Sequence, residues 1–365
     1  MKRWLRRIGI TLILVAAAAI VFLLVNELDT QTLTSRVKNE ELTVVKPDWP
    51  GNAVDQKGRF MNDEFPFLSR TSDLLRWRLG GNPFENEKAS DIRRLEVKDP
   101  SEFLSGEADG ILWLGHASFY IRMGGVVILT DPVFGAPPLV KRIVDVPSPL
   151  NMIRRVDYVL LSHDHRDHMD EATLRAVAAK FPNAKLLAGL RSEDVLNDWR
   201  TAANPIATAG WFQQFDTGDD PVNIHFVPVR HWSRRFLLDT NWRLWGGYVI
   251  EGGGRTIYFG GDSGYGRHYQ ETGEIFPNID YFLIGIGAYE PRWFMEPNHN
   301  SPDDVVKAFR DSGAHTLVPM HHGTFDLSDE PPGEPLAKLL DGARAAGIFD
   351  RVRLLAINDA LAFDE

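Results

Sequence analysis

The chain has 365 residues, of which 44% are hydrophobic and 25% are charged, a composition typical of a globular protein with a sizeable core. It has no cysteine, which excludes disulfides, thiolate metal sites and cysteine nucleophiles, so any metal must be held by histidine and carboxylate. The formal net charge of -10 argues against a nucleic-acid partner, because attraction to phosphates needs a basic face.

Residues 1–28 are predicted to form a membrane anchor. An uninterrupted apolar stretch runs from Ile8 to Val25, and as a helix it would reach roughly 27 Å, which just spans a bilayer. Cations precede it and acidic residues follow it, so we expect a single-pass protein with a cytoplasmic N-terminus and an exported domain, periplasmic if the source is bacterial. The alternative is a cleaved signal peptide, with an A-x-A-like site at Ala17-Ala18-Ala19.

The next two segments are expected to connect this anchor to the main domain. Residues 29–58 are polar, with scattered prolines and no helical period, which is typical of a linker. A folded domain is expected over residues 59–365, with residues 59–109 wrapping around its main body. In this wrap aromatic and basic residues interleave, which fits either aromatics buried against the body or an amphipathic surface that touches lipid head groups.

After Gly110 the sequence changes to short β-rich runs with helical segments between them. The predicted strands are residues 111–114, 118–122, 126–130, 157–162, 223–229, 245–250, 256–260, 281–284, 316–320 and 352–357. The predicted helices are residues 173–181, 302–310 and 335–346.

A cluster of histidine and aspartate follows the strand predicted at residues 157–162. Four such residues fall within six positions: His163, His165, Asp167 and His168. Imidazole nitrogens and carboxylate oxygens suit zinc and its neighbours. Three further residues of these types stand at the ends of later predicted strands: His231, Asp262 and His321. We therefore predict two metal ions at a sheet edge, one on His163, His165 and His231, the other on Asp167, His168 and His321, with Asp262 bridging them.

The pattern H-x-H-x-D-H at residues 163–168, with the three later residues, resembles the metallo-β-lactamase superfamily. The resemblance implies an α/β fold, a four-layer αββα sandwich with the metal site at the edge of its two sheets, here preceded by the predicted transmembrane helix. It narrows to the family of N-acyl-phosphatidylethanolamine-hydrolysing phospholipases D and their bacterial relatives. The most specific match is the heptapeptide YEPRWFM from Tyr289 to Met295.

One departure from that family concerns the last ligand. His322 stands where a tryptophan is expected, so two adjacent histidines are candidates, and the spacing to Gly323-Thr324-Phe325 favours His321. Behind the ligands, Asp131 and His116 are predicted to orient them. The alternatives are a plain turn before Pro132 for the aspartate, and a structural role or direct metal ligation for His116.

The predicted chemistry is hydrolysis by a hydroxide shared between two Zn²⁺ ions per chain, because a metal-bound water loses its proton near neutral pH. Asp167 and Asp262 are the predicted catalytic carboxylates. A substrate groove is predicted from residues around the heptapeptide, with packing or helix capping as the alternatives. Its candidates are Tyr289, Arg292, Trp293 and His299.

The resemblance implies a membrane-associated, zinc-dependent phosphodiesterase of phospholipase D type, which releases an N-acylethanolamine and phosphatidic acid. Its expected partners are a phospholipid substrate and a membrane, and a homodimer is compatible with the sequence. The first alternative is a lactonase or phosphodiesterase that uses the same two-zinc site on a soluble substrate. The second is a non-catalytic envelope or scaffold protein.

Overall fold

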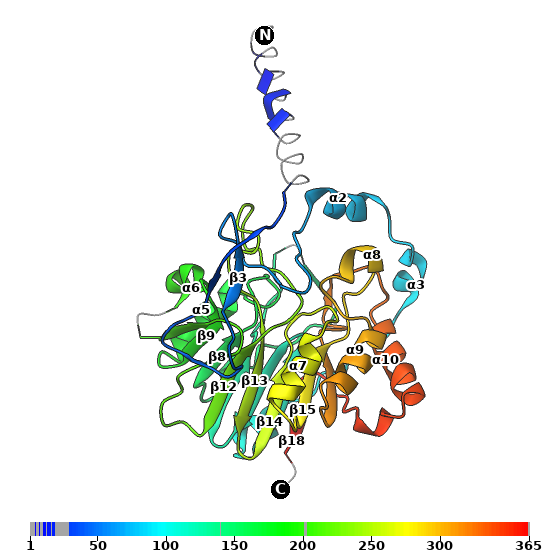
Figure 1. The fold of residues 1–365 in the computed structure, drawn as a ribbon. Coiled ribbons are helices and arrows are strands. Elements are labelled where there is room, and N and C mark those ends of the chain that lie inside the picture. The colour runs from blue at the N-terminus through cyan, green and yellow to red at the C-terminus, as the bar shows by residue number, and fades with distance from the viewer. Residues whose placement is uncertain are drawn as a thin grey trace.

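The computed structural model describes residues 29–138, 140–200 and 203–363, together with scattered residues of the first 28. Two seven-stranded sheets form its centre (Figure 1). The first sheet has the strand order β10-β9-β8-β6-β5-β4-β18. Its strands are β4 (Gly110–Gly115), β5 (Ser118–Met123), β6 (Val126–Thr130), β8 (Tyr158–Leu161), β9 (Lys185–Gly189), β10 (Ile206–Ala209) and β18 (Ala360–Ala362).

The second sheet has the strand order β16-β15-β14-β13-β12-β11-β2. Its strands are β2 (Thr43–Val44), β11 (Gln213–Gln214), β12 (Val222–Val227), β13 (Gly247–Gly252), β14 (Arg255–Phe259), β15 (Tyr281–Gly285) and β16 (Thr316–Met320). Strands β14, β15 and β16 run parallel, as do β6 and β8 in the first sheet. Parallel strands end at the same edge of a sheet, so residues that follow them are brought together.

The two sheets pack face to face because their strands carry apolar side chains on both sides, one side facing the other sheet and the other facing the helices. In β4, Ile111 and Trp113 belong to the core between the sheets, whereas Leu112 and Leu114 belong to the core on the outer side. This alternation follows from the two-residue period of a strand. The central core also contains Phe259 and other residues of the second sheet.

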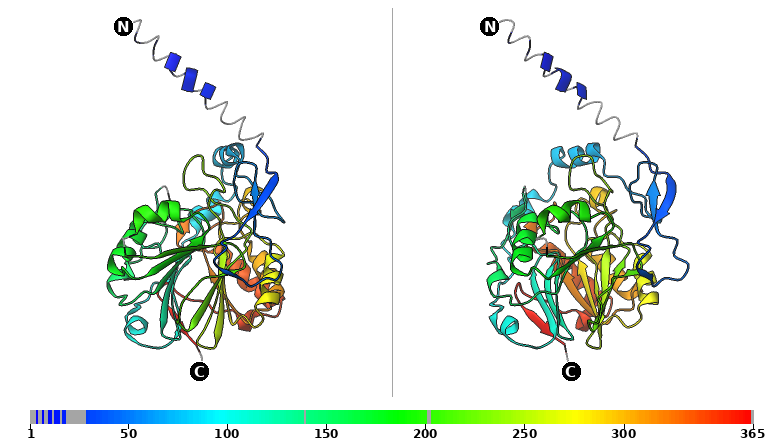
Figure 2. Two further views of the ribbon diagram at one scale, coloured as in Figure 1. Left: turned by 60° about the vertical axis from the view of Figure 1, so that its left-hand side comes forward. Right: turned by 90° about the vertical axis from the view of Figure 1, so that its left-hand side faces the viewer.

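Helices cover both outer faces (Figure 2). Helices α5 (Glu171–Lys180) and α6 (Glu193–Trp199) pack on the first sheet. Helices α7 (His268–Ile275), α9 (Pro302–Asp311) and α10 (Glu334–Ala345) pack on the second. The predicted four-layer αββα arrangement is therefore confirmed.

The strands and helices predicted from the sequence lie within two residues of observed elements, with one exception. No strand forms at residues 352–357 of the described chain. Val352 bridges to Leu317 and Ile357 bridges to Val97, so the two ends of this segment pair with different neighbours and no ladder extends between them. The strand β18 comes three residues later and closes the edge of the first sheet beside β4.

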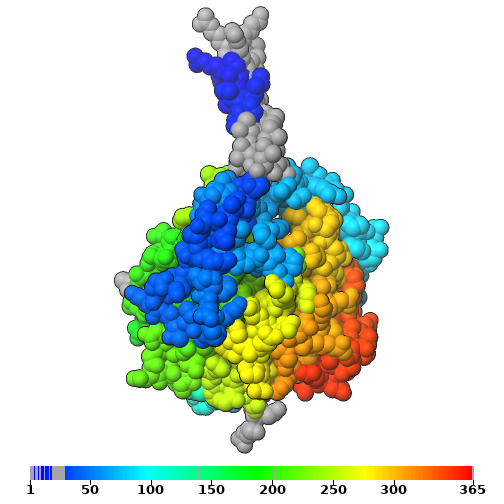
Figure 3. All heavy atoms as spheres, in the orientation of Figure 1, coloured from blue at the N-terminus to red at the C-terminus, as the bar shows by residue number. Residues whose placement is uncertain are grey.

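The prediction of a linker over residues 29–58 is wrong. Strands β1 (Leu33–Val37) and β3 (Asn52–Asp55) pair with each other, and β2 extends the second sheet by pairing with β11. Figure 3 shows this segment lying on the surface of the body. Edge pairing uses backbone hydrogen bonds and needs no long apolar pattern, which is why the polar sequence gave no sign of it.

Residues 59–109, where the wrap is predicted, form short helices. They are α2 (Thr71–Leu79), α3 (Glu85–Ser90) and α4 (Ser101–Ser105). The indole of Trp77 in α2 donates a hydrogen bond to Asp329 and lies 5.0 Å from the ring of Phe294 in α8 (Arg292–Met295).

The remaining elements are small: β7 (Lys141–Arg142), β17 (Phe325–Asp326) and the 3-10 turns η1 (Pro149–Asn151) and η2 (Phe349–Arg351).

The predicted membrane span from Ile8 to Val25 falls largely outside the described residues. Those that are described there, such as Ile13 and Leu14, are helical and exposed. Among the residues that the structure describes, no helix has the length and apolar character needed to cross a membrane. The anchor therefore stays a prediction.

Candidate metal centre

The seven predicted ligands come together at one edge of the sandwich. They lie in turns that follow β8, β12, β14 and β16, where neighbouring strands end. His321 and the nearby His116 and Asp131 have positive φ angles of 58°, 51° and 34°. Such backbone conformations are unfavourable for residues other than glycine and collect at functional sites. The turns at this edge therefore hold their side chains in positions that ordinary loops do not favour.

Three imidazoles form the first cluster. His165 Nδ1 lies 2.9 Å from His163 Nε2 and 3.2 Å from His231 Nε2. Burial lowers the pKa of all three histidines, to about 4 for His165. Neutral imidazoles with nitrogens turned toward one point are suited to bind a metal ion.

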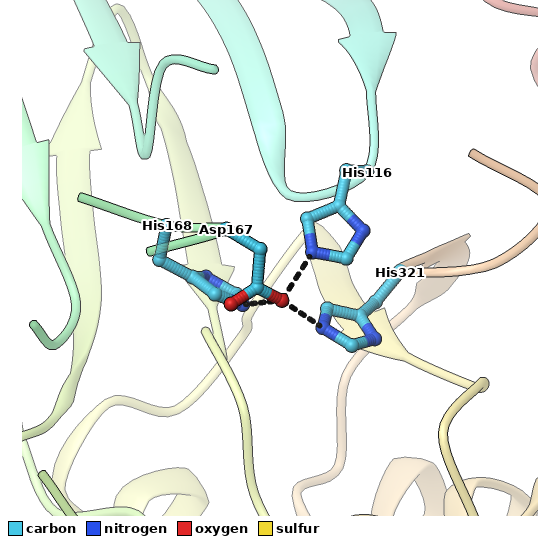
Figure 4. A group of neighbouring side chains, drawn as sticks. All are labelled: His116, Asp167, His168 and His321. Atoms are coloured by element: carbon cyan, nitrogen blue, oxygen red, sulfur yellow. Dashed lines mark hydrogen bonds and ion pairs between the residues drawn. The ribbon is translucent and has the colours of Figure 1, made fainter. Parts of the chain in front are cut away.

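The second cluster holds the ligands predicted for the second ion, Asp167, His168 and His321, and His116 lies close enough to form one group with them (Figure 4). Asp167 Oδ2 lies 3.7 Å from His168 Nε2 and 3.8 Å from His321 Nε2. Although burial opposes it, the charge of His168 holds the pKa of Asp167 far below its usual range. The cluster therefore presents one carboxylate and two imidazoles, a set that zinc and related metals accept.

Asp262 lies between the two clusters. Its Oδ2 is 3.2 Å from His168 Nε2, 3.9 Å from His231 Nε2 and 4.0 Å from His163 Nε2. Its Oδ1 is 3.0 Å from His321 Nε2. One carboxylate thus faces ligands of both clusters, which is the arrangement that the predicted bridging role requires.

Asp131 orients two of the ligands from behind. Its fully buried carboxylate accepts hydrogen bonds from the backbone N–H of Ser162 (2.8 Å) and the Ser162 hydroxyl (2.5 Å). The same carboxylate lies 2.7 Å from His168 Nδ1, and Ser162 Oγ lies 2.9 Å from His163 Nδ1. Bonds of this kind fix the ring orientation and leave Nε2 free for a metal. Sequence reasoning predicted Asp131 but missed Ser162, although it directly precedes the motif.

Two further contacts orient the site. His116 Nε2 lies 3.1 Å from Asp167 Oδ2, so His116 contacts a predicted ligand (Figure 4). His231 Nδ1 lies 3.0 Å from the backbone oxygen of Asn298, to which it donates. This second bond leaves His231 Nε2 directed at the first cluster.

The side chains fit bound metal ions better than they fit one another. Within the described residues, the buried His168 Nε2, His321 Nε2 and Asp262 Oδ1 make no hydrogen bond. His321 Nε2 and Asp262 Oδ1 are 3.0 Å apart and still do not form one. Buried polar atoms are normally paired, so unpaired atoms that converge in this way are best explained as metal ligands.

The adjacent histidines 321 and 322 are now distinguished. His321 points into the second cluster, whereas the His322 ring stacks on Trp113 with a centroid separation of 5.4 Å. The choice of His321 as the ligand agrees with this geometry.

A cavity of about 200 Å³ opens onto the two clusters. His299 lines it, with Nδ1 3.7 Å from Asp262 Oδ2. The other lining residues include Phe67, Leu74, Trp77, Arg78, Trp232, Arg234, Phe294 and Met295. This wall is apolar and aromatic, with two arginines, and most of it comes from residues that sequence reasoning did not select.

Three of the predicted substrate contacts do not line this cavity. The hydroxyl of Tyr289 is turned away and donates to Glu334, and the ring is buried. Arg292 forms an ion pair with Asp304, and the Trp293 ring lies under the guanidinium of Arg76. The heptapeptide reaches the cavity through its last two residues instead, because α8 turns Phe294 and Met295 inward.

Comparison with known proteins identifies the family. A model described as the beta-lactamase superfamily domain matches residues 127–322, over half of the chain. The chain belongs to this superfamily. Solved structures share its fold. A metallo hydrolase from Ignicoccus hospitalis gives a TM-score of 0.54 at 22% identity, covering 71% of this chain and 99% of that one. An isothiocyanate hydrolase from Delia radicum gut bacteria gives 0.55 at 19% identity, covering 70% and 98%.

Relatives in the superfamily are more similar in sequence. An uncharacterized protein of Mycobacterium tuberculosis is 35% identical over 243 residues, which cover 64% of this chain and 63% of that protein. The N-acyl-phosphatidylethanolamine-hydrolyzing phospholipase D 1 of Caenorhabditis elegans is 31% identical over 248 residues, covering 63% and 69%. The mitochondrial enzyme of that kind from Saccharomyces cerevisiae is 32% identical over 266 residues, covering 69% and 55%. The chain thus spans just under two thirds of the mycobacterial relative.

Proposed function

We propose that this protein is a metal-dependent hydrolase of phospholipase D type, which cleaves N-acyl-phosphatidylethanolamine into N-acylethanolamine and phosphatidic acid. The observation that carries the proposal is the cavity that joins two candidate metal clusters to an apolar wall and two arginines. A phosphodiester with long acyl chains needs both a cationic centre and apolar surface. The names of the two eukaryotic relatives support the same substrate.

The metal expected in these clusters is zinc, two ions per chain, because their ligands are imidazoles and carboxylates. Zinc bound here would supply a hydroxide at neutral pH and neutralise charge on the phosphoryl group. The ligands would be His163, His165 and His231 in one cluster and Asp167, His168 and His321 in the other, with Asp262 facing both.

The protein's own residues prepare the site in three ways. Asp131 and His116 hold the ligand side chains in place from behind. The positive charges of Arg78 and Arg234 in the cavity wall favour an anionic phosphodiester. Burial lowers the pKa of His299 to about 4, so its ring is neutral near pH 7 and adds no charge to the cavity.

A direct assay tests the proposal. Purified, zinc-loaded protein is incubated with N-acyl-phosphatidylethanolamine in mixed micelles, and both products are measured by mass spectrometry. We expect release of both, its loss in His165→Ala, and its retention in His225→Gln, because His225 pairs with Glu251 away from the cavity. Metal-loaded protein that releases neither product would overturn the lipid assignment, and turnover of a soluble lactone or phosphodiester in the same assay would favour that alternative.

The location follows from the same proposal. We infer that the protein works at a membrane, with the stretch from Ile8 to Val25 as a single-pass anchor and the hydrolase domain on the exported side. Fractionation of the expressing cells, followed by protease accessibility of the domain, tests both statements. Domain that is recovered unanchored in the cytoplasm would contradict them.

A further inference from the structure

Large apolar side chains are exposed at two places beside the catalytic cavity. Leu75 and Leu79 of α2 are 43% and 82% exposed. Leu237 and Leu238, in the loop that follows Trp232, are 71% and 82% exposed. Single exposed leucines are normal on a protein surface, whereas a group of them around a site indicates an interaction surface. We call these four residues the mouth surface.

Helix α2 has two distinct faces. Leu74, Trp77 and Arg78 line the catalytic cavity. Leu75 and Leu79 are one turn apart, so they share a second face of the helix. These two leucines are exposed, unlike Leu74 and Trp77 of the helix face that lines the cavity. The helix therefore forms a wall of the cavity with one side while presenting leucines to the surroundings with another.

The loop at Leu237 and Leu238 lies next to Asp29, where the continuously described part of the chain begins. Together with Asp29, these leucines line a second cavity of about 590 Å³. Ser69 lines both this cavity and the catalytic one, so the two adjoin. In the sequence, Val25, the last residue of the apolar stretch, precedes Asp29 by only four positions, and Asp29 lines the same cavity as the leucines of the mouth surface. In Figure 1 the dark-blue chain from residue 29 onward starts at the end of the body where α2 lies.

The charged and aromatic neighbours of the mouth surface suit a lipid bilayer. The last turn of α2 carries Arg76 and Arg78, although the whole chain has a net charge of -10. The Arg76 guanidinium lies 4.3 Å from the centre of the Trp293 ring, which is 46% exposed. Tryptophan and arginine beside exposed leucines are typical of surfaces that sit at the level of lipid head groups.

We propose that the mouth surface inserts its leucines into the head-group region of a membrane, so that the catalytic cavity opens onto the bilayer. The inference rests on the proposed function for the identity of the substrate, which would then enter the cavity from the membrane. The insertion itself depends on the exposed leucines, their arginine and tryptophan neighbours, and the adjoining apolar stretch.

The lack of cysteine in the chain allows a site-specific test on the full-length protein. Leu79→Cys and Leu238→Cys are each labelled with a polarity-sensitive fluorophore and mixed with vesicles of phosphatidylcholine and phosphatidylglycerol, without substrate. We expect the emission of both labels to shift to shorter wavelength and to be quenched by brominated lipids. The matched control is Phe349→Cys, because Phe349 is 41% exposed and η2 lies near the start of β16, away from the cavity.

Vesicle-bound protein whose labels at positions 79 and 238 respond no more than the label at position 349 would overturn the proposal. So would a shift that depends on protein concentration without lipid, since that result would indicate an interface between copies of the chain. The vesicles contain no substrate, so insertion is measured independently of hydrolysis. Insertion here, together with no hydrolysis in the activity assay, would reject the proposed function alone. Hydrolysis without insertion would reject the mouth surface alone.

Discussion

Replacing Asp131 with asparagine tests how the metal ligands are held. The carboxylate of Asp131 bonds to His168 Nδ1 and to the backbone and hydroxyl of Ser162, all at 2.5 to 2.8 Å. An asparagine has nearly the same size but offers only one acceptor oxygen, so at least one of these donors loses its partner. His168 is then free to carry its proton on Nε2, the nitrogen that must be unprotonated to bind metal.

The expected size of the effect follows from these contacts. A hydrogen bond to a charged group contributes about 1.5 to 3 kcal/mol, which corresponds to roughly 10- to 100-fold in affinity. We therefore expect Asp131→Asn to weaken zinc binding by roughly 10- to 100-fold. The measurement is competition for zinc with a chromophoric chelator, with thermal unfolding of the metal-free protein recorded in parallel.

Ser162→Ala is the matched control for this substitution. It removes the link to His163 but leaves the direct contact between Asp131 and His168. We expect it to weaken one cluster while Asp131→Asn weakens both. If Asp131→Asn binds both zinc ions with the affinity of the unaltered protein and the same melting temperature, the orienting role is refuted.

Three further predictions concern other contacts in the structure. His321→Ala should lose metal and activity, whereas His322→Ala should keep both and lose only about 1 kcal/mol of stability from its stacking on Trp113; metal analysis and unfolding distinguish these outcomes. The buried guanidinium of Arg243 pairs with three carboxylates. Arg243→Met should therefore lower the free energy of unfolding, measured with denaturant, by about 3 kcal/mol, and an unchanged value would contradict this prediction. Burial lowers the pKa of His268 to about 3 from its usual 6.5, so the unfolded chain binds a proton that the folded chain does not, and stability falls as pH drops from 6.5 toward 3. His268→Gln should reduce that slope by about 1.4 kcal/mol per pH unit, and equal slopes would contradict the assignment.

The sequence was most informative where local pattern and chemistry coincide. Apolar runs marked the strands that precede His163, Asp262 and His321, and those strands place the ligands at one edge. Asp262 and His321 could be placed together from strand ends alone, because β14 and β16 both run parallel to β15 and end at the same edge.

The sequence was least informative where the structure depends on contacts between distant segments. Strand β2 is two residues long and forms only because β11 offers an edge, and Trp77 reaches the cavity through contacts with Asp329 and Phe294. Tyr289 was selected for its motif, but its side chain points toward Glu334. Motif membership does not determine the direction of a side chain, and for that reason the cavity wall could not be derived from the sequence.

The central claim is that two metal ions are held by two clusters that share Asp262. Elemental analysis of the purified full-length protein, with activity measured on the same samples, tests it most directly. We expect two zinc ions per chain, one after His165→Ala or His321→Ala, and loss of hydrolysis in both variants. Full hydrolytic activity in a protein that holds a single ion, or none, would contradict the claim.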